Sequence, residues 1–424
     1  MAASPSTARA INDRFALRLL QDEGPLTATQ LKTLTGLSRP TVADLVERLQ
    51  GSGLVHVVGE SGAERRGPNA KLYGLVADRA HLAALDVRTR SVSVTVADLL
   101  GTTLAEASVP VGDDSDTGPA VEKAVTLLER TVKEAGADRL HSVAVGAPGL
   151  IDPDTGELRD SSGLPAWHRR LVGVLQERLS AHVLVENETN LAAVAELREG
   201  AARDREDFVL LWLGQGVGAA VVLGGRLRRG ASGGAGEIGF LPVPGTSGLP
   251  SATGCDGGFH ELACAAAVES LAAAHGLTAP EALASGDAWT EGAGTGNHAP
   301  GEPLAPGDTP GKPLAPGRAP GTPGEAPAPG RDAFLDALAR RLAIGAAAVV
   351  SVLDPGCVVL AGETGHQGGA ALAARVEAEL AALSPLRTEV RATALGGAAV
   401  LRGALLLARD AAQDALFGAP NAGL

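Results

Sequence analysis

Closely spaced glycines alternate with short apolar runs over residues 213–243. Gly214, Gly216 and Gly218 occupy every second position near the start of this segment. Because glycine has no Cβ atom, such a backbone lets a bound ligand approach the amide groups closely. The spacing therefore predicts a ligand-binding turn, which the surrounding elements must hold in place.

The elements expected around this turn repeat along the chain. Apolar runs predict strands over 81–87, 91–98, 102–109, 140–145 and 182–186, with helices over 120–135, 171–179 and 189–199. A strand over 207–213 then opens a second half with the same order of strand, glycine turn and strand. We expect an α/β fold of two similar lobes, with the ligand in the cleft between them.

The first 80 residues have a helical pattern instead. Helices are expected over 12–22, from Thr27, which forms a capping box with Gln30, and from Ser38, a good N-cap. Gly36 ends the second helix, and strands over 54–58 and 71–76 enclose a polar tip. The apolar faces are expected to consist of Phe15, Leu19 and Leu20, of Leu31 and Leu34, and of Val42, Leu45, Val46 and Leu49.

Two helices joined by a glycine turn and followed by a hairpin are typical of a winged helix-turn-helix, which binds DNA. The residues expected to contact DNA are Arg39 and Thr41 at base edges, and Arg48, Arg65 and Arg66 at phosphate or in a groove. For Arg48, a surface pair with Asp44 is the alternative. For the domain, the alternative is a small helical module that binds another protein.

The charge of the chain is unevenly distributed. The 424 residues have a net charge of −13, which argues against a general nucleic-acid binder. Residues 1–80 contain ten Lys and Arg against eight Asp and Glu, whereas the remainder contains 26 against 41. Since one winged helix makes few contacts, we expect two to act together on an inverted-repeat operator, in a homodimer or homotetramer.

The three cysteines form no CxxC pair, and no apolar run has the length of a membrane span or a signal core. These features predict a protein of the reducing cytoplasm with no membrane contact.

Several segments together resemble the ROK family of repressors and sugar kinases. They are Gly146–Gly149, Glu186–Asn190, the glycine turn at 214–218, Gly236–Gly239, and Leu353–Pro355 ahead of 358–362. The resemblance covers nearly the whole chain, because repressors of this family have a winged helix before the kinase-like body. It implies a two-lobed, actin-like (ribonuclease H-like) sugar-kinase fold.

The resemblance also implies which residues bind small molecules. Those at sugar or effector positions are Asn187, Glu188, Glu237 and Glu261; those at nucleotide positions are Asp86, Gly214, Gly216 and Gly218. The alternative is that the sugar-side residues now cap helices or pair with Arg228 or Arg229.

The chain departs from the kinases of this family on the catalytic side. The family's base is an aspartate, whereas Glu188 is one methylene longer, and misplacing a base by about an ångström costs around a hundredfold in rate. The phosphate turn, Asp-x-Gly-Gly-Thr in the family, has Arg88, Thr89 and Arg90 after Asp86, and Gln215 replaces a threonine. We therefore expect no kinase activity.

The family's zinc site is also incomplete. Phe240 stands where the family has the histidine of Glu-x-x-His, and the cysteine run is reduced to Cys255. Cys255 and His260 would form half a site, which does not hold structural zinc. We expect no metal and no cofactor, while Phe240 offers a face on which a sugar ring could stack.

Residues 292–331 contain seven Pro-Gly dipeptides in a decaying ten-residue repeat. Proline and glycine deny this segment regular structure, so we expect a disordered spacer with helices resuming at Asp332. A proline-rich docking ligand is the alternative.

These expectations combine into one interpretation. Residues 1–80 form the DNA-binding domain, 81–200 the first lobe, and 201–424 the second lobe with its insertion and C-terminal helices. The chain is expected to regulate carbohydrate-related genes, as a repressor, in response to a sugar or sugar phosphate. The alternatives are a sugar kinase with an accessory domain and a body that only dimerises, without an effector.

Overall fold

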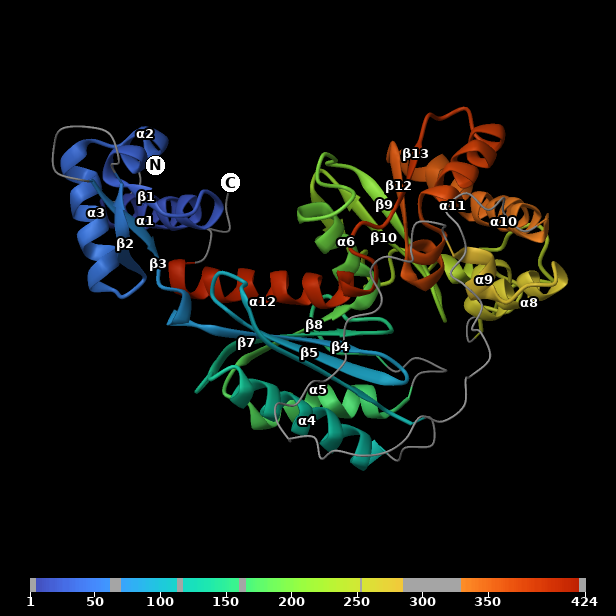
Figure 1. Ribbon diagram of the computed structural model, residues 1–424, viewed down its shortest axis with the longest axis horizontal. Helices are drawn as coiled ribbons and strands as arrows, with labels where there is room; N and C mark the ends of the chain where they lie inside the picture. The colour runs from blue at the N-terminus through green and yellow to red at the C-terminus, as the bar shows by residue number, and fades with distance from the viewer. Residues whose placement is uncertain are drawn as a thin grey trace, which may run out of the picture.

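The structure is a computed structural model that describes residues 5–61, 70–112, 117–159, 165–251, 254–284 and 329–418 (Figure 1). Two of the expectations lie outside these residues: the wing tip with Arg65 and Arg66, and the insertion as far as residue 328. Among the described helices, none combines the length and the apolar character needed to cross a bilayer.

The N-terminal domain is a winged helix. Its elements are α1 (Pro5–Asp22), β1 (Leu26–Thr27), α2 (Ala28–Thr35), α3 (Arg39–Gly51), β2 (Val55–Ser61) and β3 (Ala70–Leu75), and the antiparallel sheet has the order β1-β3-β2. The predicted starts of α2 and α3 are confirmed, since Thr27 and Gln30 form the capping box and Ser38 accepts a hydrogen bond from the Thr41 amide. The start predicted for α1, residue 12, is wrong, because that helix begins at Pro5. Gly36 ends α2 in the left-handed conformation, with φ of 70°.

The burial of side chains in this domain confirms the apolar face predicted for α3 and corrects the faces predicted for α1 and α2. The four predicted residues of α3, Val42, Leu45, Val46 and Leu49, are all buried. In α1 and α2, however, Phe15 is 45% exposed and Leu34 is 44% exposed. The inward stripe of α1 runs instead through Ala16, Leu17 and Leu20, at the spacing of one helical face.

The first lobe is a five-stranded sheet of order β6-β5-β4-β7-β8, in which β4, β7 and β8 are parallel. Its elements are η1 (Ala77–Arg79), β4 (His81–Val87), β5 (Ser91–Asp98), β6 (Thr103–Pro110), α4 (Thr117–Glu134), β7 (Leu140–Ala147), α5 (Trp167–Arg178), β8 (His182–Asn187) and α6 (Glu188–Arg198). Helices α4 and α5 cover one face of the sheet and contribute to one apolar core (Figure 1).

The second lobe has the equivalent strand order, β11-β10-β9-β12-β13, so the predicted duplication is confirmed. Its elements are β9 (Phe208–Leu213), β10 (Val217–Leu223), β11 (Arg226–Arg228), η2 (Ile238–Phe240), α7 (His260–Ala263), α8 (Ala265–Ala274), α9 (Ala279–Leu283), α10 (Pro329–Leu353), β12 (Cys357–Ala361), α11 (Gly362–Leu383), β13 (Glu389–Ala392) and η3 (Gly396–Ala398). Because α10 begins at Pro329, the predicted end of the insertion at residue 331 is too late.

The last helix, α12 (Ala399–Phe417), does not stay with the second lobe. It crosses the uncovered face of the first-lobe sheet and packs against α6 (Figure 1). The approach is so close that a Cβ atom on Gly403 would collide with the backbone of Leu191. At its far end α12 meets the N-terminal domain, where Arg14 pairs with Asp414 at 2.7 Å and Gln413 donates to Gln21 at 2.9 Å. The N-terminal domain is thus anchored on the first lobe.

The chain passes between the lobes twice, from α6 to β9 and from β13 to α12. One buried carboxylate joins these two connections. Glu196 accepts hydrogen bonds from the amides of Ala201 on the first connection, at 2.6 Å, and of Ala394 and Leu395 on the second, at 3.1 Å each. The Thr393 hydroxyl donates to the same carboxylate.

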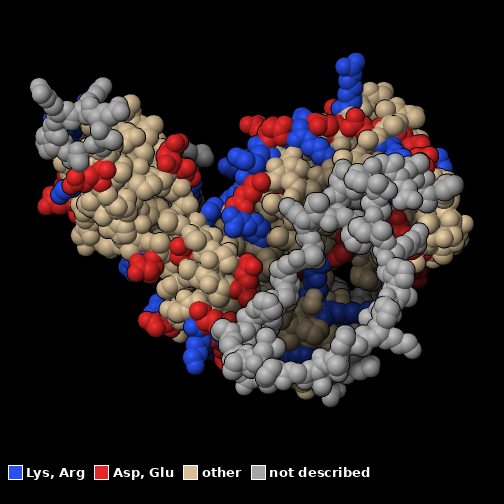
Figure 2. All heavy atoms as spheres, viewed as in Figure 1, with Lys and Arg blue, Asp and Glu red and all other residues tan. Residues whose placement is uncertain are grey.

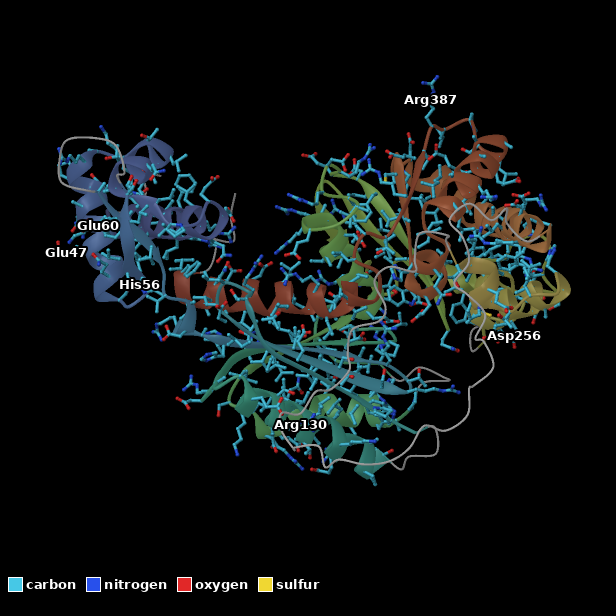
Figure 3. The ribbon with its side chains drawn as sticks, in the orientation of Figure 1. Glu47, His56, Glu60, Arg130, Asp256 and Arg387 are labelled. Carbon is cyan, nitrogen blue, oxygen red and sulfur yellow. The ribbon has the colours of Figure 1, made fainter. Side chains whose placement is uncertain are left out.

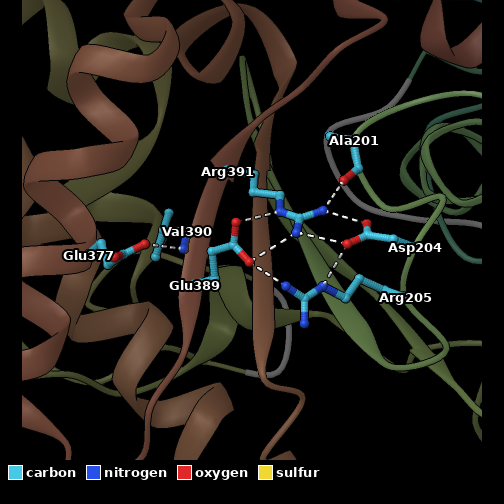
Figure 4. A network of polar contacts seen from close by, with 7 residues as sticks. All are labelled: Ala201, Asp204, Arg205, Glu377, Glu389, Val390 and Arg391. Carbon is cyan, nitrogen blue, oxygen red and sulfur yellow. Dashed lines mark hydrogen bonds and ion pairs between the residues drawn. The ribbon is translucent and has the colours of Figure 1, made fainter.

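A surface network reinforces the same junction (Figure 4). Arg391 of β13 pairs with Asp204 at 2.6 Å and donates to the Ala201 carbonyl at 2.6 Å. Glu389 accepts from Arg391 at 2.8 Å and from Arg205. The first connection is therefore held to the edge of the second-lobe sheet as well as to Glu196.

Replacing Glu196 tests how much this junction contributes to the stability of the fold. Glu196→Ala leaves buried N–H groups without an acceptor, so we expect the free energy of unfolding to fall by about 2–4 kcal/mol. Urea denaturation followed by circular dichroism measures the change. Glu134→Ala, which removes an exposed carboxylate paired with Arg130 at 3.4 Å, is the control; it should cost less than about 0.5 kcal/mol. Equal stability of the two variants would contradict the assignment.

Candidate ligand site and DNA-binding surface

Three parallel strands end at one edge of the first-lobe sheet. Asp86 of β4 lies opposite Gly146 of β7, which in turn lies opposite Glu186 of β8. Asn187 follows as the N-cap of α6, and Glu188 is the first residue of that helix. The carboxyl ends of parallel strands are a common place for ligands in α/β folds. The sequence motifs therefore converge on this edge.

The second lobe approaches the same edge through its glycine turn. A Cβ atom built on Gly218 would lie 3.6 Å from the Thr189 hydroxyl and 4.0 Å from the Gly236 carbonyl. Glu237 comes next in the chain and interacts electrostatically with Glu188, as does Asp86. We call Asp86, Glu188 and Glu237 the carboxylate cluster. It unites residues of both lobes, as the sequence motifs implied.

Burial dominates the titration of this cluster. It raises the pKa of Glu188 to about 8, and the nearby charges of Asp86 and Glu237 act in the same direction. Burial also raises the pKa of Asp86, although Arg88 opposes that shift. The Glu237 side chain is exposed to solvent. Nearby protein atoms still remove part of the hydration of its carboxylate, and this desolvation raises its pKa. Among the described residues, no hydrogen-bond partner reaches Asp86 Oδ1 or Glu188 Oε2.

The phosphate-turn position is occupied by an arginine that bridges the lobes. Arg88 donates to Asp86 at 2.9 Å and to Glu363, at the start of α11, at 2.6 Å. Its guanidinium carbon lies 5.9 Å from the centre of the Trp212 ring, within cation–π range. Gly214 lies directly beside this pair, since a Cβ atom there would collide with the Glu363 carboxylate.

Two of the predicted sugar-side residues make hydrogen bonds within the protein. Asn187 accepts from the amides of Thr189 and Asn190 and donates to the Gly149 carbonyl at 3.0 Å. Glu261 accepts from the amide and hydroxyl of Ser247 and from the amide of Gly257, so it organises a loop of the second lobe.

The arginines suggested as partners for these residues behave differently. Arg229 pairs with Glu186 at 2.6 Å rather than with Asn187, Glu237 or Glu261. Arg228 donates to the Leu223 carbonyl.

The N-terminal domain presents the start of α3 on its surface. Arg39 and Thr41 are exposed, and in the described part of the chain Arg39 has no ion-pair partner. Arg48 instead pairs with Asp44, as the alternative interpretation expected, and with Asp13 at 2.5 Å.

Acidic residues are also present on the surface of this domain, among them Asp44 of α3, which pairs with Arg48. In Figure 3, Glu47 and Glu60 lie at the outer side of this domain, near His56. Figure 2 shows the domain projecting from the body, with acidic and basic side chains interspersed on the visible face. The first turn of α3 exposes Arg39 and Thr41, the two residues expected to contact base edges.

Comparison with known proteins matches both parts of the chain. Residues 82–291 match the model of the ROK family, and residues 13–67 match that of the MarR family. The chain thus matches a ROK domain that follows a region matching a MarR-type winged helix. The fold agrees: a crystal structure of a ROK family transcriptional regulator, a homologue of the E. coli MLC protein, has a TM-score of 0.71 at 18% identity, over 97% of this chain and 98% of that one.

Curated relatives of the ROK domain include both regulators and enzymes. The xylose repressor of Caldicellulosiruptor bescii is 25% identical over 55% of this chain and 59% of its own length. The glucokinase of Halalkalibacterium halodurans is 33% identical over 31% of this chain and 40% of its own length. The chain thus spans less than two thirds of these relatives.

The ROK domain differs from the expected half-site for zinc. His260 hydrogen-bonds with Cys264, which lowers the pKa of that thiol and raises the pKa of His260. Within the described residues, His, Cys, Asp and Glu side chains nowhere gather in a group of three that could hold a metal ion. Phe240 is 40% exposed, so its ring is accessible for stacking.

Three features of the ROK domain escaped the sequence analysis. They are the Arg88–Glu363 bridge, the Arg229–Glu186 pair and buried His168, whose pKa burial lowers to about 4. In the sequence, Arg88 was considered only as a departure from the family's phosphate turn. Its partner Glu363 is 275 positions away, and no local pattern connects the two.

The raised pKa of Glu188 predicts how stability depends on pH. The unfolded chain ionises this group near 4.5 and the folded chain near 8, so the group lowers stability progressively between those values. Glu188→Gln should therefore be more stable than the wild type by about 2–4 kcal/mol at pH 7.5, with the difference vanishing below about pH 4.5. Urea denaturation across this range measures it. A difference independent of pH, as expected for Glu134→Gln, would contradict the assignment.

Proposed function

We propose that this protein is a DNA-binding transcriptional regulator, a repressor of carbohydrate-related genes, whose ROK domain binds a sugar-like effector at the carboxylate cluster. The MarR-type winged helix and the similarity to the xylose repressor support DNA binding and a sugar-linked role. The path of α12 is the observation that carries the proposal, because it connects the two sites.

That path runs from the ligand site to the DNA-binding domain. Helix α12 begins at the second connection between the lobes and packs on α6, the helix that begins with Glu188. It ends at the ion pairs of Asp414 with Arg14 and Arg18 on α1. A ligand held between the lobes would change how the second lobe sits relative to the first lobe, α12 and the winged helix.

Such a movement regulates DNA binding if two chains act together. A homodimer or homotetramer joined through its second lobes would place its winged helices at a spacing that depends on the angle between the lobes. Only one spacing fits both halves of an inverted repeat. Ligand binding then shifts the population between a state that fits DNA and one that does not.

A sugar kinase is the second candidate, favoured by the glucokinase relative and by the pKa of Glu188, which lies in the range of a general acid or base. The position of Arg88 argues against it. Its guanidinium fills the space beside Gly214 and Glu363 where the turn would hold the phosphates of ATP. We therefore propose that phosphoryl transfer has been lost.

Substitution at α3 tests the DNA-binding role. Arg39→Ala should weaken binding to fragments selected from the source genome by about 1–3 kcal/mol, because it removes a contact to a base edge. Fluorescence anisotropy at fixed salt measures the affinity. Arg130→Ala, an exposed residue of α4 on the first lobe (Figure 3), is the control and should bind like the wild type. Identical isotherms for the two variants would refute the role of α3.

A coupled assay tests the loss of phosphoryl transfer. No ATP-dependent phosphorylation of glucose, N-acetylglucosamine or N-acetylmannosamine is expected. Glu188→Asp should not restore it, since Arg88 still occupies the phosphate side. Turnover on the order of 1–100 per second with any of these sugars would favour the kinase instead.

A further inference from the structure

The carboxylate cluster contains acceptor atoms that the protein leaves unused. Asp86 is only 4% exposed, yet its Oδ1 has no hydrogen-bond partner among the described residues, and the same holds for Glu188 Oε2. In that part of the chain, the Glu237 carboxylate likewise makes no hydrogen bond or ion pair. Buried polar atoms of native proteins are normally paired. Asp86 and Glu188 therefore call for a ligand that donates hydrogen bonds, and the solvent-exposed Glu237 offers a further acceptor beside them.

The cations near this cluster are already engaged. Arg88 is shared between Asp86 and Glu363, and Arg229 is paired with Glu186 at 2.6 Å. Glu186 also accepts from the Asn187 amide and the Asn190 side chain, so both of its oxygen atoms are engaged. Even with Glu188 protonated, the remaining carboxylates outnumber the two guanidinium groups, and the edge has an excess of negative charge.

The excess of negative charge and the unpaired acceptor atoms of the cluster distinguish between classes of ligand. A phosphate would add negative charge beside Asp86 and Glu188, two carboxyl groups whose pKa burial already raises. A neutral hydroxyl donates one hydrogen bond and leaves the charge uncompensated. An ammonium group donates three hydrogen bonds and carries the missing positive charge. It satisfies both requirements of the cluster.

We propose that the ligand of this site is an amino sugar whose free ammonium group lies among Asp86, Glu188 and Glu237, and that sugar phosphates are excluded. This inference rests on the proposed function, because it names the effector class of the same site. Hydroxyl groups of the ring would bind toward the second lobe, where the exposed ring of Phe240 offers a stacking face.

Calorimetric titration of the full chain at pH 6.5 tests this inference. The probes are glucosamine, N-acetylglucosamine, glucose and glucose 6-phosphate. Glucosamine should bind at least about tenfold more tightly than N-acetylglucosamine, which places a neutral amide at the same carbon, and than glucose, while glucose 6-phosphate should not bind. Equal or tighter binding of the acetylated, neutral or phosphorylated sugar, or no binding of glucosamine, would overturn the inference.

Variants test whether the carboxylate cluster is responsible for the preference for glucosamine. Glu237→Gln, at an exposed position that should not affect folding, and Asp86→Asn, at the buried one, should each reduce the preference for glucosamine over glucose by fivefold or more. Glu134→Gln on α4 should leave it unchanged. An undiminished preference in both cluster variants would refute this location.

A parallel measurement separates this inference from the proposed function. DNA affinity is determined in the same preparation by anisotropy, with and without glucosamine. Specific DNA binding that does not respond to the amine, together with no preference in calorimetry, overturns the ligand class but leaves the regulator. Absence of specific DNA binding overturns the regulator, whatever the calorimetry gives.

Discussion

The carboxylate of Glu196 is where the two halves of the body are joined. Each lobe has its own sheet, two segments of chain connect them, and one apolar cluster continues from Leu191 of α6 to Phe208 of β9. Both segments donate backbone N–H groups to this single fully buried side chain. A charged group in such a place is stable only because every donor points at it. The two connections therefore behave as one unit.

This junction determines what can move. Ion pairs of Arg391 hold the first connection to the second-lobe sheet, whereas α12 leaves the second connection and packs along the first lobe as far as the winged helix. Any change in the angle between the lobes must therefore act on the connections near Glu196 and on the packing of α6 against β9 and β10. On the opposite side, the Arg88–Glu363 pair links the lobes through side chains alone. A ligand that breaks the Arg88–Glu363 pair would therefore change the angle between the lobes.

The sequence predicted local structure well because its signals are local. The capping box at Thr27, the N-cap at Ser38 and the left-handed turn at Gly36 each depend on residues within one helical turn. The duplicated strand order likewise follows from repeated apolar runs. Phe15 was wrongly expected to be buried, since apolar residues occur on neighbouring faces of α1 and periodicity alone does not show which face packs inward.

The site was predicted only in part, for a related reason. Motifs brought Glu188 and Glu237 to the same edge, but their energetics depend on Arg88, Glu363 and Glu186, which come from distant parts of the chain. Whether Asn187 binds a ligand or caps α6 depends on its backbone geometry. No spacing rule supplies that information.

The location of α12 also has a consequence for synthesis on the ribosome. Leu82 and Ala84 of β4 share an apolar cluster with Val400 and Ala404 of α12, more than 300 positions later. At a translation rate of about 5–20 residues per second, that face of the early sheet waits roughly 15–60 seconds for its cover. The second lobe, contiguous from β9 to β13, is complete before then. Nascent chains should therefore expose this apolar face, and depend on chaperones that shield it, until translation reaches the last helix.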